Sequence, residues 1–511
     1  MTNQNCGVSS LYDPARQRWR ANGVHPVSTK MHETGIPSDD AAKRRSGPTL
    51  DQAEKSATGY VSLEGLHGTV EVPDHGTGVW RQFRAYTGPA LLVSVGYMDP
   101  GNWGTDLAGG ARYQYDLLWV VLLASIMAIF LQVTSARLGV VTGKDLAQAC
   151  RDWYPSWTRW PNWLMCEVAI GACDLAEVLG SAVALNLLFG IPLLWAVLIT
   201  AADVFLLLAL QRFGMRTIEA VVLVLVATIG VCYFIEIFIL PATRPDFVAM
   251  GHALLRPGLR QVGMSYVAIG IIGATVMPHN LYLHSALVQS RKLRLTDEHH
   301  TRTAILFNTI DSTLALGVAF LVNAGILVLA AMVFYGRESV TVAGGETVDF
   351  GADADWIRVA YLTLAPLLGT AAASVLFAVA LLASGQSSTI TGTLAGQVVM
   401  EGFMHWRLAP WVRRMVTRSL AILPAVLIIG IRGDSSVNDL LTLSQVVLAL
   451  QLPFAMFPLL HFTRSRKRMG RWKNGWLLLS AGWASALLIT AMDIYGLPDS
   501  LANAWQVIGG R

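Results

Sequence analysis

Asp99 and Asn102 could bind a cation inside a segment that otherwise reads as membrane-spanning. They supply a carboxylate and an amide oxygen three positions apart, directly after the almost wholly apolar residues 87–98. Pro100 lacks an N–H donor and Gly101 adds backbone freedom, so we expect a helix to break here and leave carbonyl groups without helical partners. In hydrocarbon such groups are costly unless the break lines a buried or watery cavity. A charge in that setting indicates a functional site.

A second apolar segment is interrupted in the same way. Residues 269–276 are followed by the sequence Met277-Pro278-His279-Asn280. At this break Met277 offers a thioether sulfur and Ala274 could offer a freed carbonyl. Two interrupted spans in one chain are typical of a transporter built from two structural repeats. The alternative for either break alone is an ordinary proline kink.

The two breaks together supply a mixed set of ligands for a metal ion. Mg(II) and Ca(II) prefer oxygen ligands only, whereas Mn(II), Fe(II) and the softer Cd(II) tolerate or favour sulfur. Met277 therefore favours a transition metal, although a methionine in a membrane helix can also simply fill space in the core. Gln445 is an isolated amide in another apolar segment, and is either a packing residue or a transient ligand.

Three acidic residues share one face of the third predicted span. Glu167, Asp174 and Glu177 lie within about 80 degrees of one another around a helix, because each residue advances the helix by about 100 degrees. Three acids on one strip are too costly to face lipid. They are therefore expected to line a polar path or to meet cations, for which span nine offers Arg413, Arg414 and Arg418. Ion pairing and proton transfer both remain open.

His279 and His284 follow the second break, where a group that titrates near neutral pH could pass protons. Histidine is also a metal ligand, but it would hold a transported ion tightly and slow its release. We therefore assign His279 to gating or proton transfer. For His284, polar packing is an equal alternative.

The elements that must position these residues are membrane helices. The chain has 511 residues, of which 53% are hydrophobic and 14% charged, and this composition indicates a polytopic membrane protein. At about 20 apolar residues per span, we predict eleven spans, at about 86–112, 117–140, 160–188, 191–211, 217–241, 263–290, 303–335, 365–402, 413–431, 437–462 and 475–496.

Alternate loops differ in their content of lysine and arginine. The loops after the even-numbered spans carry most of these residues, which makes them cytoplasmic and places the amino terminus inside and, with eleven spans, the carboxy terminus outside. Residues 1–80 are polar and are expected to form a disordered cytoplasmic tail, followed by the transporter domain at 81–511. The five cysteines include no CxxC pair, so neither a disulfide framework nor a cysteine metal site is expected.

These residues together resemble the Nramp family of proton-coupled divalent-metal transporters, which includes bacterial manganese importers. The resemblance covers nearly the whole chain from about residue 85. It rests on four motifs: DPGN at Asp99 to Asn102, DLAE at Asp174 to Glu177, MPHNLYLHSALVQSR at Met277 to Arg291, and GQSSTITGTLAGQ at Gly385 to Gln397. The amino-terminal tail is the one departure from the family pattern.

The resemblance implies a leucine-transporter-type fold, with inverted five-helix repeats at about 86–241 and 263–462, discontinuous spans 1 and 6, and an extra span at 475–496. It implies that the metal is held by Asp99, Asn102, Met277 and the Ala274 carbonyl, and that Gln445 joins them in some conformations. The predicted proton pathway consists of Asp99, Glu167, Asp174, Glu177, His279, Arg413 and Arg414.

The predicted function is import of Mn(II), with Fe(II) as a further substrate and Cd(II) tolerated, by proton symport across a bacterial plasma membrane. The expected partners are the metal ion, protons and the lipid bilayer, with no nucleic acid and no cofactor. Alternatives are a Mg(II)-transporting relative, against which Met277 counts, and a sodium-coupled amino-acid symporter, whose substrate carboxylate Asp99 would repel. An intramembrane enzyme that uses Asp99 and His279 as acid and base is a further alternative, but no nucleophile motif supports it.

Overall fold

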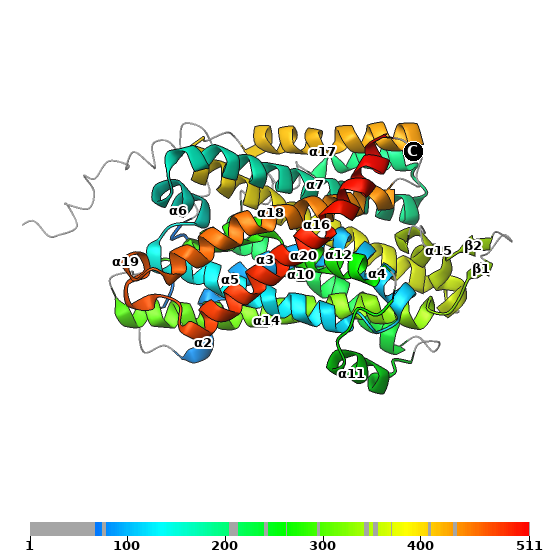
Figure 1. Cartoon of the computed structure of the whole chain (residues 1–511), viewed down its shortest axis with the longest axis horizontal. Helices are drawn as coiled ribbons and strands as arrows, with labels where there is room; N and C mark the ends of the chain where they lie inside the picture. The colour runs from blue at the N-terminus through cyan, green and yellow to red at the C-terminus, as the bar shows by residue number, and fades with distance from the viewer. Residues whose placement is uncertain are drawn as a thin grey trace, which may run out of the picture. The chain divides into compact units, whose positions relative to one another are not determined.

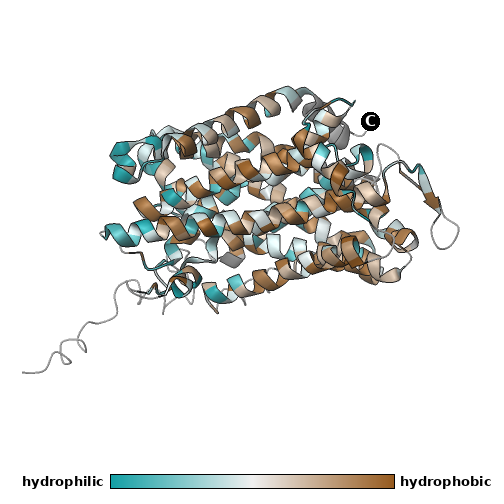
Figure 2. Cartoon of the chain, turned by 90° about the horizontal axis from the view of Figure 1, so that it is seen from below, coloured by the Kyte–Doolittle hydropathy of each residue, from teal (hydrophilic) through white to brown (hydrophobic). Residues whose placement is uncertain are grey.

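Long apolar helices make up most of the described chain. The computed structural model describes residues 67–73, 78–203, 213–239, 244–261, 263–293, 297–341, 347–350, 356–368, 370–406, 410–432 and 437–509. Among these residues, nine helices are long and apolar enough to cross a membrane. Figure 2 shows hydrophobic residues along the helices and hydrophilic residues gathered at their ends and in the connecting segments. The predicted polytopic helical architecture is therefore confirmed.

The first half of the membrane-helix region starts with a broken helix, made of α3 (Pro89–Ser94), the 3-10 turn η2 (Val95–Met98) and α4 (Pro100–Tyr113). A short helix, α2 (Val79–Tyr86), precedes it. The helices that follow are α5 (Leu118–Thr142), α6 (Leu146–Trp153), α7 (Arg159–Phe189), α8 (Leu193–Thr200) and α10 (Met215–Phe234), which continues into the π-helical turn η4 (Ile235–Ile239).

The second half starts with another broken helix, made of α12 (Met264–Thr275) and α13 (Pro278–Leu287), which ends in the turn η5 (Val288–Ser290). The long helices that follow are α14 (Glu298–Val333), α16 (Ala371–Met404), α17 (Pro410–Arg432), α18 (Val437–Arg464) and α20 (Trp476–Gly509). The first half corresponds to five predicted spans, an odd number, so the second half is expected to begin on the opposite side of the membrane from the first, as in inverted repeats.

The connecting elements separate into two groups at opposite ends of the helices (Figure 1). At one end lie α2, α6 and the short α19 (Arg466–Met469). At the other lie α11 (Phe247–Leu255), α15 (Trp356–Leu368) and the hairpin of β1 (Ser339–Thr341) and β2 (Thr347–Asp349). The loops predicted to be cytoplasmic and those predicted to be external therefore lie at different ends.

Several predicted boundaries differ from the structure. The stretch 365–402 is two helices, because Thr370 accepts a hydrogen bond from the Ala372 N–H and caps a new helix, α16, after α15 has ended. The last helix continues past residue 496 to Gly509. Predicted span four is described only in part, through α8 and as far as residue 203, and residues 204–212 lie outside the described residues.

The end of the predicted amino-terminal tail has a defined position. Residues 67–73 lie within the predicted tail, yet the Gly68 and Val70 N–H groups donate to the Gln289 and Ser290 carbonyls, and the Lys292 N–H donates to the Val70 carbonyl. The expectation of disorder up to residue 80 therefore does not hold for these residues. Residues 1–66, which make up the rest of the predicted tail, lie outside the described residues.

Candidate functional site

Both helix breaks occur where the sequence predicts them, and a proline starts the continuing helix at each. Pro100 is the first residue of α4, with Asp99 as its cap, and Pro278 is the first residue of α13, with Met277 as its cap. Proline is favoured at this position because its missing N–H would have no helical partner there. The residue before each helix is extended, so neither broken helix continues across its break.

Asp99 and Asn102 are fully buried and contact each other at the first break. Asp99 Oδ1 accepts from the Asn102 backbone N–H at 3.0 Å and from its amide Nδ2 at 2.7 Å. The same Nδ2 donates to the Ala274 carbonyl at 3.1 Å, which brings the two breaks into direct contact. Asp99, Asn102 and Ala274 therefore lie together in one polar site.

The orientation of the Asn102 amide bears on metal binding. Its nitrogen faces the oxygens of Asp99 and Ala274, while its Oδ1 accepts from the Thr275 hydroxyl at 3.4 Å. A cation bound between the two breaks would meet this oxygen only after the amide turns over. Asp99 Oδ2 has no hydrogen-bond partner among the described residues, so it is free to bind a cation or a proton.

Gln445 of α18 lies against the first turn of α4. A Cβ atom added to Gly101 would stand 1.8 Å from Gln445 Nε2, so any larger residue at this position would displace the Gln445 amide. Gln445 Nε2 donates to Ser444 Oγ at 3.0 Å, and Oε1 is buried without a partner in the described part of the chain. A second unpaired oxygen therefore lies next to the start of α4.

Met277 is completely buried and packs with Ala169, Cys173 and Leu448. Its position at the second break suits a ligand, and its apolar neighbours suit a packing residue. In the described residues no group of three or more His, Cys, Asp or Glu side chains could hold a metal ion. A metal site here would therefore depend on amide, carbonyl or sulfur ligands.

The acidic face of α7 meets the arginines of α17. Glu167 pairs with Arg413 at 3.0 Å, and Asp174 forms an ion pair with Arg414. The predicted arginine partners are therefore present. Glu167 is partly accessible, whereas Asp174 and Arg414 are fully buried.

Glu177 lies farther from its arginine neighbours than Glu167 and Asp174 do. Its carboxylate accepts from Ser388 Oγ at 2.9 Å and lies 3.4 Å from the Arg414 guanidinium and 3.7 Å from that of Arg418. Arg418 makes its closer ion pair with Asp203 instead. Glu177 is therefore near two arginines without a close ion pair to either.

His279 and His284 differ in their surroundings. His279 Nε2 lies 3.7 Å from Cys173 Sγ, which is itself 3.5 Å from the Glu177 carboxylate. His279 is thus connected to the acidic face of α7. His284 instead lies 2.9 Å from Gln132 Oε1, and Gln132 donates to the Tyr97 hydroxyl, which places His284 in a separate polar group.

The polar, small residues of α16 make room for this cluster. A Cβ atom added to Gly392 would lie 2.9 Å from the Glu177 carboxylate, and one added to Gly396 would lie 1.9 Å from the Arg413 guanidinium. The close packing of α16 against α7, which small residues permit, therefore also accommodates the ion pairs.

The sequence analysis missed several residues that complete the site. Asn323 donates to the Tyr97 carbonyl, which the first break leaves without a helical partner. Asp311 accepts from the Gly88 and Ala90 N–H groups at the start of α3. Asp203 and Asp311 are acids inside predicted spans, so the rule that identified Asp99 could have found them. The position of Cys173 carries no such signal.

The sequence is similar to one family of proteins and to several of its named members. The sequence profile of the Nramp family, described as natural resistance-associated macrophage protein-like, matches residues 90–499. The divalent metal cation transporter MntH of Nostoc sp. (strain PCC 7120) is 50% identical over 442 residues, which are 86% of this chain and 96% of the relative. The MntH of Listeria monocytogenes serotype 4a (strain HCC23) is 47% identical over 454 residues, 88% of this chain and 98% of the relative.

Solved structures of other transporters are similar to this chain. A crystal structure of the Eremococcus coleocola manganese transporter is 39% identical and superposes with a TM-score of 0.77 over 88% of this chain and 96% of that one. Mhp1, a nucleobase-cation-symport-1 family transporter, is 14% identical with a TM-score of 0.51, over 83% of this chain and 93% of that one, and shares the fold alone. These matches confirm the predicted leucine-transporter-type fold.

Proposed function

This chain belongs to the Nramp family, and from that premise we propose that it is a secondary transporter which imports divalent transition-metal ions by proton symport. Mn(II) is the proposed main substrate and Fe(II) a further one, with Cd(II) tolerated. The relatives are named for divalent metal cation and manganese transport, which supports the metal as cargo. A transporter of this kind needs no cofactor, because the metal ion is the substrate.

The observation that carries the proposal is the contact between the two helix breaks. Asn102 Nδ2 touches both Asp99 Oδ1 and the Ala274 carbonyl, and all three residues are fully buried. A buried carboxylate oxygen without a partner is costly unless a cation or proton neutralises it. Asp99 Oδ2 is such an atom in the described part of the chain, and it lies at the start of α4, where backbone N–H groups also favour negative charge.

The choice of metal rests on Met277. Its location at the second break would add one soft ligand to a set of oxygens from Asp99, Asn102 and Ala274, with Gln445 joining in some conformations. Such a set favours Mn(II), Fe(II) and Cd(II) over Mg(II) and Ca(II). This argument separates the proposal from a Mg(II)-transporting relative.

Protons are proposed to move through the cluster beside the metal site. The path would include Asp99, His279, Asp174 and Glu177, with Glu167, Arg413 and Arg414 toward one end of α7. Cys173 contacts both His279 and Glu177, which supports continuity between the metal site and the acidic face of α7.

The proposed location is a bacterial plasma membrane, with the amino terminus in the cytoplasm and the carboxy terminus outside. The distribution of basic residues supports this orientation. An amino-acid symporter is less well supported, because Asp99 would repel a substrate carboxylate. An enzyme is less well supported because the relatives are named transporters.

Metal uptake into proteoliposomes tests the proposal. The native protein should accumulate Mn(II) under an inward proton gradient and acidify the lumen as it does so. Asp99→Ala should abolish both Mn(II) binding and uptake without loss of folding, because it removes the one full negative charge among the proposed ligands. Asp152→Ala is the matched control, since it removes an exposed carboxylate that pairs with Lys144. Near-normal Mn(II) uptake by correctly inserted Asp99→Ala protein would refute the site.

A further inference from the structure

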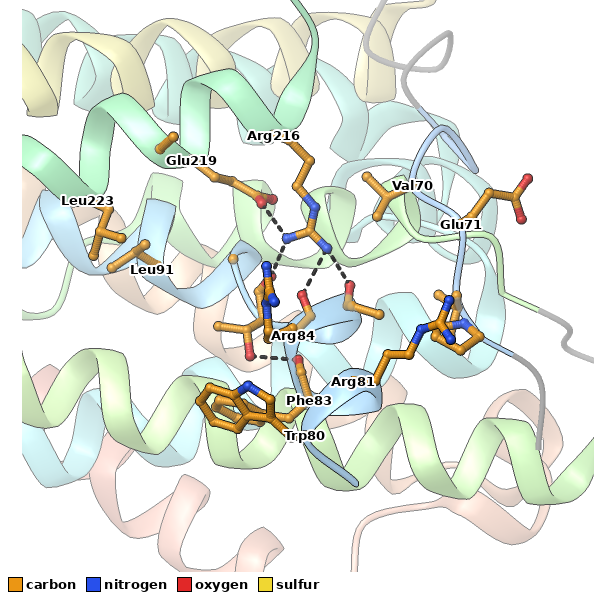
Figure 3. A pocket seen from close by; sticks show the side chains of 16 residues that line it. Val70, Glu71, Trp80, Arg81, Phe83, Arg84, Leu91, Arg216, Glu219 and Leu223 are labelled. Atoms are coloured by element: carbon orange, nitrogen blue, oxygen red, sulfur yellow. Dashed lines mark hydrogen bonds and ion pairs between the residues drawn. The ribbon is translucent and has the colours of Figure 1, made fainter. Parts of the chain in front are cut away.

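A cavity of about 940 Å³ opens where α2 meets α3 and α10, and none of the proposed metal ligands lines it. Its walls include aromatic side chains of α2, Trp80 and Phe83, and aliphatic side chains of α3 and α10, Leu91 and Leu223. Figure 3 shows Leu91 and Leu223 together at one end of the cavity and Arg81 toward the other. The cavity therefore has an apolar part and a basic part.

Helix α2 has the character of a helix that lies at a membrane surface. Its sequence, VWRQFRAY, places Trp80 and Phe83 in stacked contact, with ring centroids 5.6 Å apart, while Arg81 and Arg84 are exposed. Trp80 is 70% exposed and Leu223 of α10 is 53% exposed. Tryptophan is enriched at the membrane interface, and short amphipathic helices with basic residues lie in it.

The acidic residues of the cavity are already neutralised. Glu219 pairs with both Arg216 and Arg291 at 2.8 Å, and Glu71 pairs with Lys292 at 2.7 Å. Their negative charge is therefore not available to balance further cations.

Arg216 is fully engaged as well. Besides Glu219 it donates to the carbonyls of Arg84, Ala85 and Thr87, and so holds the end of α2 against α10 (Figure 3). By contrast, Arg81 and Arg84 form no ion pair with any residue that the structure describes. The cavity thus presents two exposed positive charges that have no counter-ion within the described part of the chain.

We propose that this cavity binds an anionic glycerophospholipid of the adjoining leaflet. The phosphate lies at Arg81 and Arg84, and an acyl chain lies over Leu91 and Leu223. A lipid of this class satisfies both parts of the cavity at once, since the arginines need an anion and the exposed aliphatic surface needs an apolar partner. A free phosphate ion would leave the apolar part uncovered, and a zwitterionic lipid would add a positive charge beside the arginines.

Native mass spectrometry of the full chain in detergent tests this proposal. The protein is stripped of lipid and titrated with phosphatidylglycerol, with phosphatidylcholine of the same acyl chains, or with inorganic phosphate. We expect one tightly retained phosphatidylglycerol, weaker retention of phosphatidylcholine, and no displacement of bound lipid by millimolar phosphate. A basic side chain near an anionic lipid contributes about fivefold in affinity, so Arg81→Gln with Arg84→Gln should weaken phosphatidylglycerol binding about 25-fold.

Two further variants separate this site from general charge effects. Arg466→Gln with Lys467→Gln removes two exposed positive charges at the same end of the helices, away from the cavity, and should leave binding unchanged. Ala220→Trp keeps both arginines but fills the cavity wall on α10, and should also release the lipid. Equal loss in the Arg466/Lys467 control, retention of both lipids alike, or full displacement by inorganic phosphate would each overturn the proposal.

Discussion

Replacement of Glu177 by glutamine should reduce proton transport but leave the stability of the fold nearly unchanged. The reason is that the ion cluster around Glu177 contains one more acidic group than basic groups. Among the described residues the buried cluster contains Asp174, Glu177 and Asp203 against Arg414 and Arg418. With all five groups charged the cluster is negative by one unit. Protonation of one carboxylate, or its replacement by an amide, makes it neutral.

The distances indicate which carboxylate is the surplus one. Asp174 and Asp203 each form the closest contact of one arginine, while Glu177 stands at 3.4 and 3.7 Å from the two guanidinium groups and receives its shortest hydrogen bond from Ser388. Glu177→Gln can still accept that hydrogen bond and breaks no close ion pair. We therefore expect its free energy of unfolding to change by about 1 kcal/mol or less, the typical contribution of one hydrogen bond.

Asp174→Asn provides the comparison. It removes the closest partner of a buried arginine, which typically costs about 3 to 5 kcal/mol. In transport, Glu177→Gln should retain Mn(II) binding but lose most of the metal-driven acidification, because an amide cannot accept and release a proton near neutral pH. Asp174→Asn should show a weaker defect in coupling and a larger defect in stability.

The assay combines a luminal pH dye with Mn(II) uptake in proteoliposomes, calorimetric Mn(II) binding, and unfolding curves of the same preparations. Ser388→Ala is the control, since it removes the hydrogen bond and keeps the carboxylate, and it should retain proton flux. Unchanged proton flux in Glu177→Gln would return the residue to a structural role. Destabilisation equal to that of Asp174→Asn would refute the reasoning from surplus charge.

Two further predictions concern the proposed ligands. Met277→Ala should reduce Cd(II) uptake more than Mn(II) uptake and should let millimolar Mg(II) or Ca(II) compete better, because the sulfur is lost while the oxygens stay; an equal loss for all ions would instead indicate a packing residue that leaves a cavity. Gly101→Ala should displace Gln445, whose Nε2 would lie 1.8 Å from the new Cβ, and lower Mn(II) affinity by calorimetry. In a double variant with Gln445→Ala the two losses should not add, since both act through one contact; simple additivity would contradict this coupling.

The helix breaks could be predicted from the sequence because their cause is local. Pro100 and Pro278 each fix the backbone at the first position of a helix, and this requires no knowledge of distant residues. The boundary between α15 and α16 could not be predicted from hydropathy, because both helices are apolar and only the cap at Thr370 separates them.

The sequence predicts which groups of residues meet in the site, but it does not predict which individual residues pair. The three acidic residues on one face of α7 predict cationic partners, and the arginines of span nine were the predicted partners. Which arginine pairs with which acid, Arg414 with Asp174 and Arg418 with Asp203, depends on how α7, α8 and α17 pack together. Likewise, the orientation of the Asn102 amide depends on the Ala274 carbonyl of the other broken helix, which accepts from its nitrogen together with Asp99. Tertiary packing determines these pairings and orientations, and they cannot be predicted from the spacing of residues along the chain.

Cys173 lies between the proposed metal site and the proposed proton pathway. It packs against Met277 on one side, and its sulfur lies 3.5 Å from the Glu177 carboxylate and 3.7 Å from His279 Nε2 on the other. One small side chain thus separates the proposed metal site from the groups proposed to carry the proton. Charges this close interact strongly in a buried setting, where water screens them little. A divalent cation bound at Asp99 and Met277 would therefore disfavour a proton on His279 or Glu177, and entry of the metal would itself drive the proton onward.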